Sequence, residues 1–247
     1  MPSDHSTWFL LDSGPGNPAF NMALDEALLE SMSRLGKPVL RFYGWTEPAA
    51  TFGYFQKYAD VERATPLRPL IRRPTGGGIV PHDADWTYSL AFPPGHEWHS
   101  LKAEESYRRV HAWIQAAFAE LKIKTDLAPC CNPSILDTRH STLPAACFVG
   151  HVKFDLLWKG GKIAGAAQRR SKLGLLIQGS VQPSSFQKSE VRSQQSERAA
   201  WQNAMRDVGR AILGADCQEF GPDATLQERA EELAGQKYSQ GTYNHKR

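Results

Sequence analysis

The chain carries the segment RRPTGGGIVPHD at residues 72–83. We expect Leu70–Arg73 to form a short strand that runs into the three glycines, and Ile79-Val80 to continue as strand. Three consecutive glycines pack no side chain and cost backbone entropy, so they suit a loop that turns through positive φ or lies close to a ligand. No Gly-Lys-Ser or Gly-Lys-Thr follows, so the loop is not a P-loop. A glycine-rich turn without a ligand is the alternative.

Charged side chains flank the glycines on both sides. Arg72 and Arg73 precede them and could offer guanidinium donors to a phosphate or a carboxylate. The pair His82-Asp83 begins four residues after Gly78. It could take part in catalysis. The alternative is a structural role, in which hydrogen bonds made by His82 close the loop.

A second candidate segment is GKIAGAAQRR at residues 161–170. Lys162 directly follows a tight turn expected at Gly160-Gly161. Gly165, Ala166 and Ala167 leave little side-chain bulk on this strand, so a long flexible ligand could lie along it with its polar head at Lys162. The alternative is an exposed turn lysine next to a strand that merely packs closely.

Cys147 lies between a proline-rich stretch, Thr125–Ala146, and an expected strand. A cysteine at such a junction can act as a nucleophile if a positive neighbour stabilises its thiolate. It can equally be a small buried hydrophobe. The four cysteines of the chain form no C-x-x-C pair, which argues against a zinc site, and we expect no bound metal.

The pattern of apolar residues, glycines and prolines predicts an α+β fold with a mainly antiparallel sheet. One domain is expected over residues 1–247, with a polar linker at Pro183–Arg198. The expected helices are Pro18–Leu35, capped by Asn17 and ended by Gly36, then Ala103–Leu121, Glu197–Leu213 and Ala224–Gln236. The expected strands are Val39–Tyr43, Ala50–Tyr54, Leu70–Arg73, Trp86–Phe92, Phe148–Trp158, Lys162–Arg169 and Leu173–Val181.

Composition narrows the class of protein. Hydrophobic residues make up 41% of 247, which is enough for a substantial core. The net charge is only +3 and no long Lys/Arg run is present, so we expect no nucleic-acid partner. No stretch approaches the roughly 18 apolar residues that span a bilayer. The N-terminus lacks the features of a signal peptide, and a cytoplasmic location is expected without membrane association.

Three segments together resemble the signature blocks of the lipoate–protein ligase and octanoyltransferase family: NMALDEAL at 21–28, the arginine–glycine block at 72–83, and Lys162–Arg169. The resemblance extends from about residue 8 to residue 245. It implies the catalytic fold shared with biotin–protein ligases and class II synthetases, in which helices flank a mixed, mainly antiparallel central sheet. It also implies an acyl tunnel between the glycine loop and the Lys162 strand. The implied acceptor is a lysine on a lipoyl domain of a 2-oxoacid dehydrogenase subunit or on the glycine-cleavage H protein.

Two chemistries occur in this family. Ligases activate free lipoate with Mg-ATP through an acyl-adenylate, whereas octanoyltransferases take octanoyl from acyl carrier protein. The segment Ala146-Cys147-Phe148 resembles the catalytic region of the cysteine-dependent octanoyltransferases, and we expect no further C-terminal domain of the kind that many ligases carry. Both points favour an octanoyltransferase that needs no ATP, metal or other cofactor. A lipoate ligase is the alternative, with a biotin ligase as its variant. A binding protein without turnover is a third hypothesis.

The resemblance assigns roles to ten residues and leaves some departures. Cys147 and Lys162 are the expected catalytic residues. The expected acyl- or substrate-binding residues are Arg72, Arg73, Gly76, Gly77, Gly78, His82, Gly165 and Ala167. Gln178 stands where the family usually has histidine, and Pro81 where a larger apolar residue is common. The closing segment Tyr238–Asn244 lacks the family's usual tryptophan.

Overall fold

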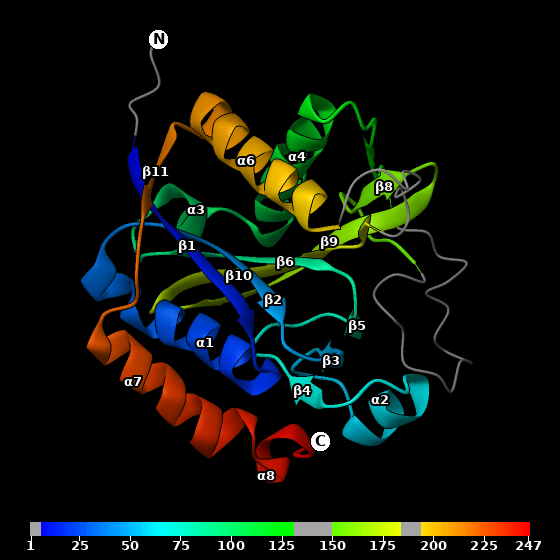
Figure 1. Cartoon of the computed structure of the whole chain (residues 1–247), viewed down its shortest axis with the longest axis vertical. Coiled ribbons are helices and arrows are strands. Elements are labelled where there is room, and N and C mark those ends of the chain that lie inside the picture. The colour runs from blue at the N-terminus through cyan, green and yellow to red at the C-terminus, as the bar shows by residue number, and fades with distance from the viewer. Residues whose placement is uncertain (1–5, 131–149, 184–193) are drawn as a thin grey trace.

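The computed structural model describes residues 6–130, 150–183 and 194–247. Its largest element is an eight-stranded sheet with the strand order β11-β1-β2-β6-β10-β9-β8-β7 (Figure 1). β1 pairs in parallel with β2 and β11, and the remaining neighbours pair antiparallel. The strands are β1 Ser6–Gly16, β2 Val39–Trp45, β6 Trp86–Phe92, β7 Asp126–Leu127, β8 Leu156–Trp158, β9 Gly161–Ser171, β10 Gly174–Val181 and β11 Ala215–Glu219.

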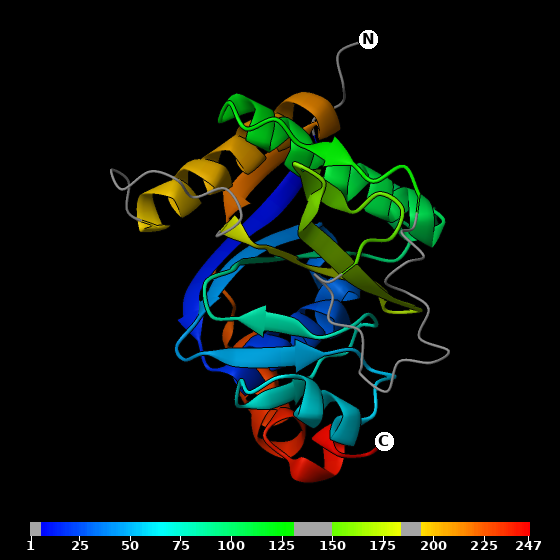
Figure 2. The ribbon, with the colours of Figure 1, turned by 90° about the vertical axis from the view of Figure 1, so that its right-hand side faces the viewer.

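A second, three-stranded sheet lies beside the large one (Figure 2). Its order is β4-β3-β5, with β3 parallel to β4 and antiparallel to β5. The strands are short: β3 Ala49–Phe52, β4 Leu70–Arg72 and β5 Val80–His82. The triple-glycine loop connects β4 to β5, so this small sheet carries the loop towards the large sheet.

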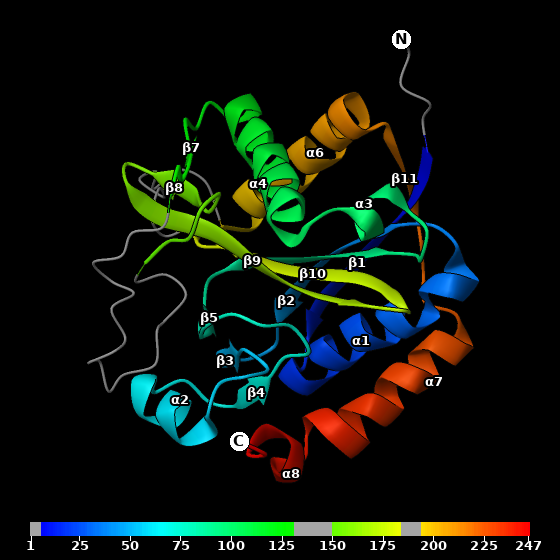
Figure 3. The same ribbon diagram turned by 180° about the vertical axis from the view of Figure 1, so that it is seen from behind.

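Helices cover both faces of the large sheet (Figures 1 and 3). α4 and α6 pack on one face, and α1 with α7 on the other. The alternation in β6 explains this: Tyr88 and Leu90 join the core under α4 and α6, whereas Ala91 joins the core under α1. The helices are α1 Pro18–Leu35, α2 Tyr58–Ala64, α3 Glu97–Ser100, α4 Ala103–Glu120, α6 Gln194–Leu213, α7 Ala224–Leu233, the π-helix η2 Ala234–Tyr238 and α8 Gly241–Asn244.

The predicted α+β class is confirmed, and two elements match their predicted bounds. The Asn17 side chain accepts hydrogen bonds from the backbone N–H groups of Ala19 and Phe20, and so begins α1 at Pro18. Gly36 ends the helix at a φ of 65°, in the left-handed region that glycine adopts without strain. β6 spans Trp86–Phe92 as predicted.

Other predictions need correction. Within the described residues the strand predicted at Phe148–Trp158 is reduced to Leu156–Trp158, because a turn with Phe154 at a φ of 71° precedes it. The tight turn that follows uses Lys159 and Gly160, at φ of 50° and 81°, rather than Gly160-Gly161. The predicted linker is helical from Gln194 onward, and its residues 184–193 lie outside the described part of the chain. The long strand β1 and the short elements α2, α3, β7, β11 and α8 were not predicted.

Among the described residues, no helix is both long enough and apolar enough to cross a membrane.

A buried histidine makes the fold sensitive to acid. His111 of α4 is almost completely inaccessible. Burial lowers the pKa of its imidazole from 6.5 to about 4, and the nearby Lys162 acts in the same direction while Asp155 opposes it. The unfolded chain therefore binds a proton on His111 more readily than the folded chain does, and stability is lost as the pH falls from 6.5 towards 4.

We expect His111 alone to lower the free energy of unfolding by about 2 kcal/mol between pH 6.5 and pH 4.5. Urea denaturation at the two pH values measures the effect. His111→Gln, which cannot titrate, should show a smaller loss over the same interval. An equal loss in the variant and the wild type would contradict this prediction.

Candidate active site

A cavity opens between the two sheets, bounded by the glycine loop and β5 on one side and by β9 and β10 on the other. Its volume is about 480 Å³, including the open mouth. Most of its wall is apolar or made of small residues. The lining residues are Met22, Tyr43, Thr51, Arg73, Gly77, Val80, His82, Thr87, Lys162, Gly165, Ala166, Ala167, Gln178, Gly179 and Ser180. A cavity of this kind suits a slender apolar chain with a polar head.

Arg73 fixes the shape of the glycine loop. Its guanidinium donates to the carbonyl oxygens of Gly76 at 2.6 Å and Gly78 at 2.8 Å, bracketing Gly77. Gly77 has a φ of 88° and reaches the cavity wall. On its other side the loop touches the main chain of Gly53, where an added Cβ would lie 2.0 Å from the Gly77 oxygen. Glycine is therefore required at position 53 by close backbone approach.

Arg72 occupies a different position from the ligand contact expected from the sequence. It is fully buried and does not belong to the described cavity lining. Its guanidinium donates to the carbonyl oxygens of Tyr54, Gln56 and Asn244 at 2.7–2.8 Å. Successive side chains alternate across an extended chain, so two adjacent arginines serve opposite sides of the loop. Arg72 joins the small sheet to the last helix.

Lys162 reaches the cavity from the start of β9. Its ammonium lies 2.7 Å from the Asp155 carboxylate, and the two side chains are only 9% and 3% exposed. The Lys162 chain passes over Gly165, where an added Cβ would lie 2.7 Å from the lysine Cε. Gly165 and Ala167, both expected at the site, line the same wall. Asp155 was not identified from the sequence, where only its proximity to the lysine block marked it.

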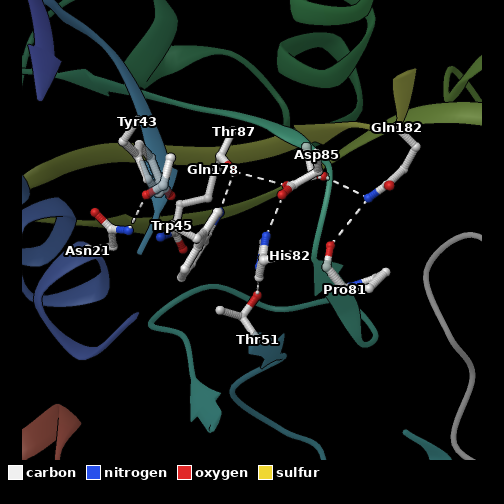
Figure 4. Close-up of polar contacts among 12 residues, drawn as sticks. Asn21, Tyr43, Trp45, Thr51, Pro81, His82, Asp85, Thr87, Gln178 and Gln182 are labelled. Atoms are coloured by element: carbon white, nitrogen blue, oxygen red, sulfur yellow. Dashed lines mark hydrogen bonds and ion pairs between the residues drawn. The ribbon is translucent and has the colours of Figure 1, made fainter. Parts of the chain in front are cut away.

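His82 is held between two hydrogen bonds and an aromatic ring (Figure 4). Its Nε2 pairs with the Thr51 hydroxyl at 2.8 Å and its Nδ1 with the Asp85 carboxylate at 2.9 Å. The Trp45 ring stacks on the imidazole with centroids 3.8 Å apart. The acid that partners His82 is thus the buried Asp85, while the adjacent Asp83, named with His82 in the sequence, is exposed. These contacts are compatible with the structural role considered for His82, and the residue also lies in the cavity wall.

Gln178 connects the cavity to a buried ion pair. Its amide nitrogen donates to the Asp25 carboxylate at 2.7 Å, and its amide oxygen accepts from the Thr75 hydroxyl at 2.8 Å. Asp25 in turn pairs with Arg41 at 2.7 Å, and both are almost completely inaccessible. Gln178 therefore links the residue before the glycines to the interior of the large sheet. Figure 4 shows its side chain near Tyr43.

Besides Arg72, three of the residues expected at the site are not among the described residues that line the cavity. Cys147 lies outside the described residues. Gly76 and Gly78 shape the loop through their carbonyl groups, but in the described part of the chain only Gly77 of the three lines the cavity. Among the same residues no group of three or more His, Cys, Asp and Glu side chains is arranged to hold a metal ion.

The comparison with known proteins identifies the family. The model of the lipoyl protein ligase A/B catalytic domain matches residues 17–234. The chain belongs to this family, as its sequence blocks predicted.

The chain is similar in sequence to curated proteins named octanoyltransferase LipM. The chain is 40% identical over 184 residues to the octanoyltransferase LipM of Geobacillus kaustophilus, a match that covers 70% of this chain and 64% of that protein. It is 36% identical over 181 residues to the octanoyltransferase LipM of Bacillus subtilis, covering 71% and 65%. The chain thus spans just under two thirds of the length of the curated relatives it matches.

Solved structures share the fold. A lipoate-protein ligase A bound with ATP superposes with a TM-score of 0.75 at 22% identity, over 97% of this chain and 99% of that one. A putative lipoate protein ligase from T. acidophilum with bound lipoic acid gives 0.75 at 21% identity, over 98% and 100%. These likenesses confirm the predicted architecture.

The close approach of Gly53 to Gly77 can be tested by adding one methyl group. Gly53→Ala must push the loop from its place, and we expect the free energy of unfolding to fall by about 1–3 kcal/mol. Urea denaturation measures the change. Gly221→Ala is the matched control, because an added Cβ there has no neighbour within 4 Å among the described residues. An unchanged unfolding midpoint in Gly53→Ala would show that the contact is not tight.

Proposed function

We propose that this protein is an octanoyltransferase of lipoate biosynthesis, which moves an octanoyl group from acyl carrier protein to a lysine of a lipoyl domain. The observation that carries the proposal is the position of Lys162 at the wall of a narrow, mostly apolar cavity that the glycine loop closes from the other side. A hydrocarbon chain would lie along Gly165, Ala166 and Ala167. Its carbonyl end would then meet the ammonium.

The reaction runs in two transfers. The Cys147 thiolate attacks the thioester carbonyl of the donor, the carrier's thiolate leaves, and an acyl-enzyme thioester forms. The deprotonated amine of the acceptor lysine then attacks the same carbonyl and gives up one N–H proton to the solvent, the Cys147 thiolate leaves, and an amide forms. In each step negative charge develops on the carbonyl oxygen, and the Lys162 ammonium stabilises it. A thioester is already activated, so this route consumes no ATP and needs no metal.

Support for a transferase comes from the family membership and from the relatives named octanoyltransferase. The sequence around Cys147 supplies the nucleophile that the route requires. The acceptors that fit are lipoyl domains of 2-oxoacid dehydrogenase subunits or the glycine-cleavage H protein. We place the activity in the cytoplasm and assign it to one catalytic domain over residues 1–247.

Intact-mass analysis tests the proposal directly. Incubation with octanoyl-acyl carrier protein should add one octanoyl group to the wild-type protein, and Cys147→Ala should abolish the adduct. Cys217→Ala is the matched control and should keep it, because Cys217 lies on β11 outside the cavity lining and burial raises the pKa of its thiol.

Two results would overturn the transferase. One is the absence of an adduct under all conditions. The other is lipoate-dependent release of pyrophosphate from ATP that is undiminished in Cys147→Ala, which would establish the ligase chemistry instead. Restored growth of a lipoate-deficient strain by this chain would exclude a binding protein without turnover.

A further inference from the structure

We propose that Asp155 is a positioning residue for the proposed transfer: it holds the Lys162 ammonium against the cavity wall, over the gap left by Gly165, before any substrate binds. The inference rests on the proposed function for its kinetic consequence, but the placement of the lysine can be tested without it.

The first observation is the burial of the pair. The Lys162 Nζ and the Asp155 Oδ2 are 2.7 Å apart, and neither side chain is more than one tenth exposed. Lys162 belongs to the cavity lining, whereas Asp155 lies behind it and outside that lining. A cation in such a place is costly unless an opposite charge meets it.

The second observation is the space that both groups share. A Cβ added at Gly165 would lie 2.7 Å from the Lys162 Cε, 2.8 Å from its Nζ and 3.3 Å from the Asp155 Oδ1. The ion pair therefore fills the volume that a side chain at position 165 would need. Glycine at position 165 therefore does more than leave space for an acyl chain. Any larger residue there would displace the Lys162 ammonium.

The third observation is the rigidity of the Asp155 carboxylate itself. Its Oδ2 also accepts from the backbone N–H of Val152 at 2.8 Å. Its main chain is held as well, since its carbonyl accepts from the N–H of Ala128 and Phe154 donates to the Ala128 carbonyl, both at 2.8 Å. Phe154 adopts a φ of 71°, a strained conformation for a bulky residue, which tertiary contacts must maintain. The turn before β8 is thus built to present one carboxylate to the lysine.

The surroundings explain why the pair can act as a fixed unit. His111 and Tyr88 are buried near the ion pair. Burial raises the pKa of Tyr88 and lowers the pKa of His111, so both side chains are neutral near pH 7. In the proposed reaction, charge on the thioester oxygen is stabilised most when the ammonium is already in place and needs no reorganisation. Asp155 supplies that preorganisation without touching the substrate.

The placement is tested first by chemical labelling of Lys162. Mass spectrometry would follow the modification of Lys162 in the intact protein by a small amine-acylating reagent at fixed pH. We expect Asp155→Asn and Gly165→Ala to label at least about fivefold faster than the wild type, because a released lysine becomes exposed. Asp155→Glu should recover part of the protection. Gly161→Ala is the matched control on the same strand, since in the described part of the chain its added Cβ meets only the Trp158 carbonyl oxygen, at 3.6 Å.

The kinetic test uses the rate of acyl-enzyme formation in a single turnover. Asp155→Asn should lower this rate by about 10–100-fold, the range for loss of one preorganised group, with little change in donor affinity. Lys162→Met should lower it at least as much. Adding Asp155→Asn to Lys162→Met should then have little further effect, because Asp155 acts through the lysine. Urea denaturation of each variant shows whether it folds.

Each outcome decides a separate point. Unchanged labelling of Lys162 in a folded Asp155→Asn variant would overturn the positioning role. So would an equal loss of rate from Asp155→Asn in the presence and absence of Lys162, which would indicate a general structural effect. If the wild type forms no acyl-enzyme but the labelling differences are found, the proposed function fails while the placement of the lysine stands.

Discussion

The cavity depends on one buried carboxylate in the interior of the protein. Asp25 of α1 forms an ion pair with Arg41 of β2 and accepts further hydrogen bonds from hydroxyl groups on β2 and β6 and from the amide of Gln178 on β10. A charge so completely removed from water is tolerated only when several donors surround it. The donors that surround Asp25 connect α1 to β2, β6 and β10. Through Thr75 this connection extends to the glycine loop, so the loop is held in register with the large sheet.

The same arrangement recurs around the cavity. Three carboxylates are set back from its wall, and each orients a group that faces inward: Asp25 acts through Gln178, Asp85 through His82 and Asp155 through Lys162. The floor beneath them is made of small residues and main chain. Polar groups with saturated hydrogen bonds can border a hydrocarbon without the cost of unpaired donors. The site thus combines an apolar interior with fixed polar positions, which is what the proposed transfer of an octanoyl group requires.

Local features of the sequence were sufficient to predict the bounds of some helices and strands. The caps of α1 and the alternation of β6 act within a few residues, so their bounds could be predicted. The neighbouring arginines could not be distinguished, because Arg73 and Arg72 differ only in which side of the strand they face. The bond from Gln178 to Asp25 joins positions 153 residues apart, and no spacing rule reveals it. β11 was missed because ADCQE is short and polar, and its pairing with β1 supplies the order that propensity lacks.

The contact between Gly53 and Gly77 has a consequence for engineering. At this contact the main chain of the glycine loop lies directly on the main chain at Gly53. No side chain lies between these two segments that a substitution could shorten or extend. Directed evolution towards longer or bulkier ligands therefore has little to select on at that part of the cavity wall. Other parts of the lining are side chains, such as those of Met22 and Val80, and substitution of these side chains is the more direct way to change the size of the cavity. The contact between the loop and Gly53 therefore fixes one part of the cavity wall, and side chains elsewhere in the lining set the size of ligand that the cavity accepts.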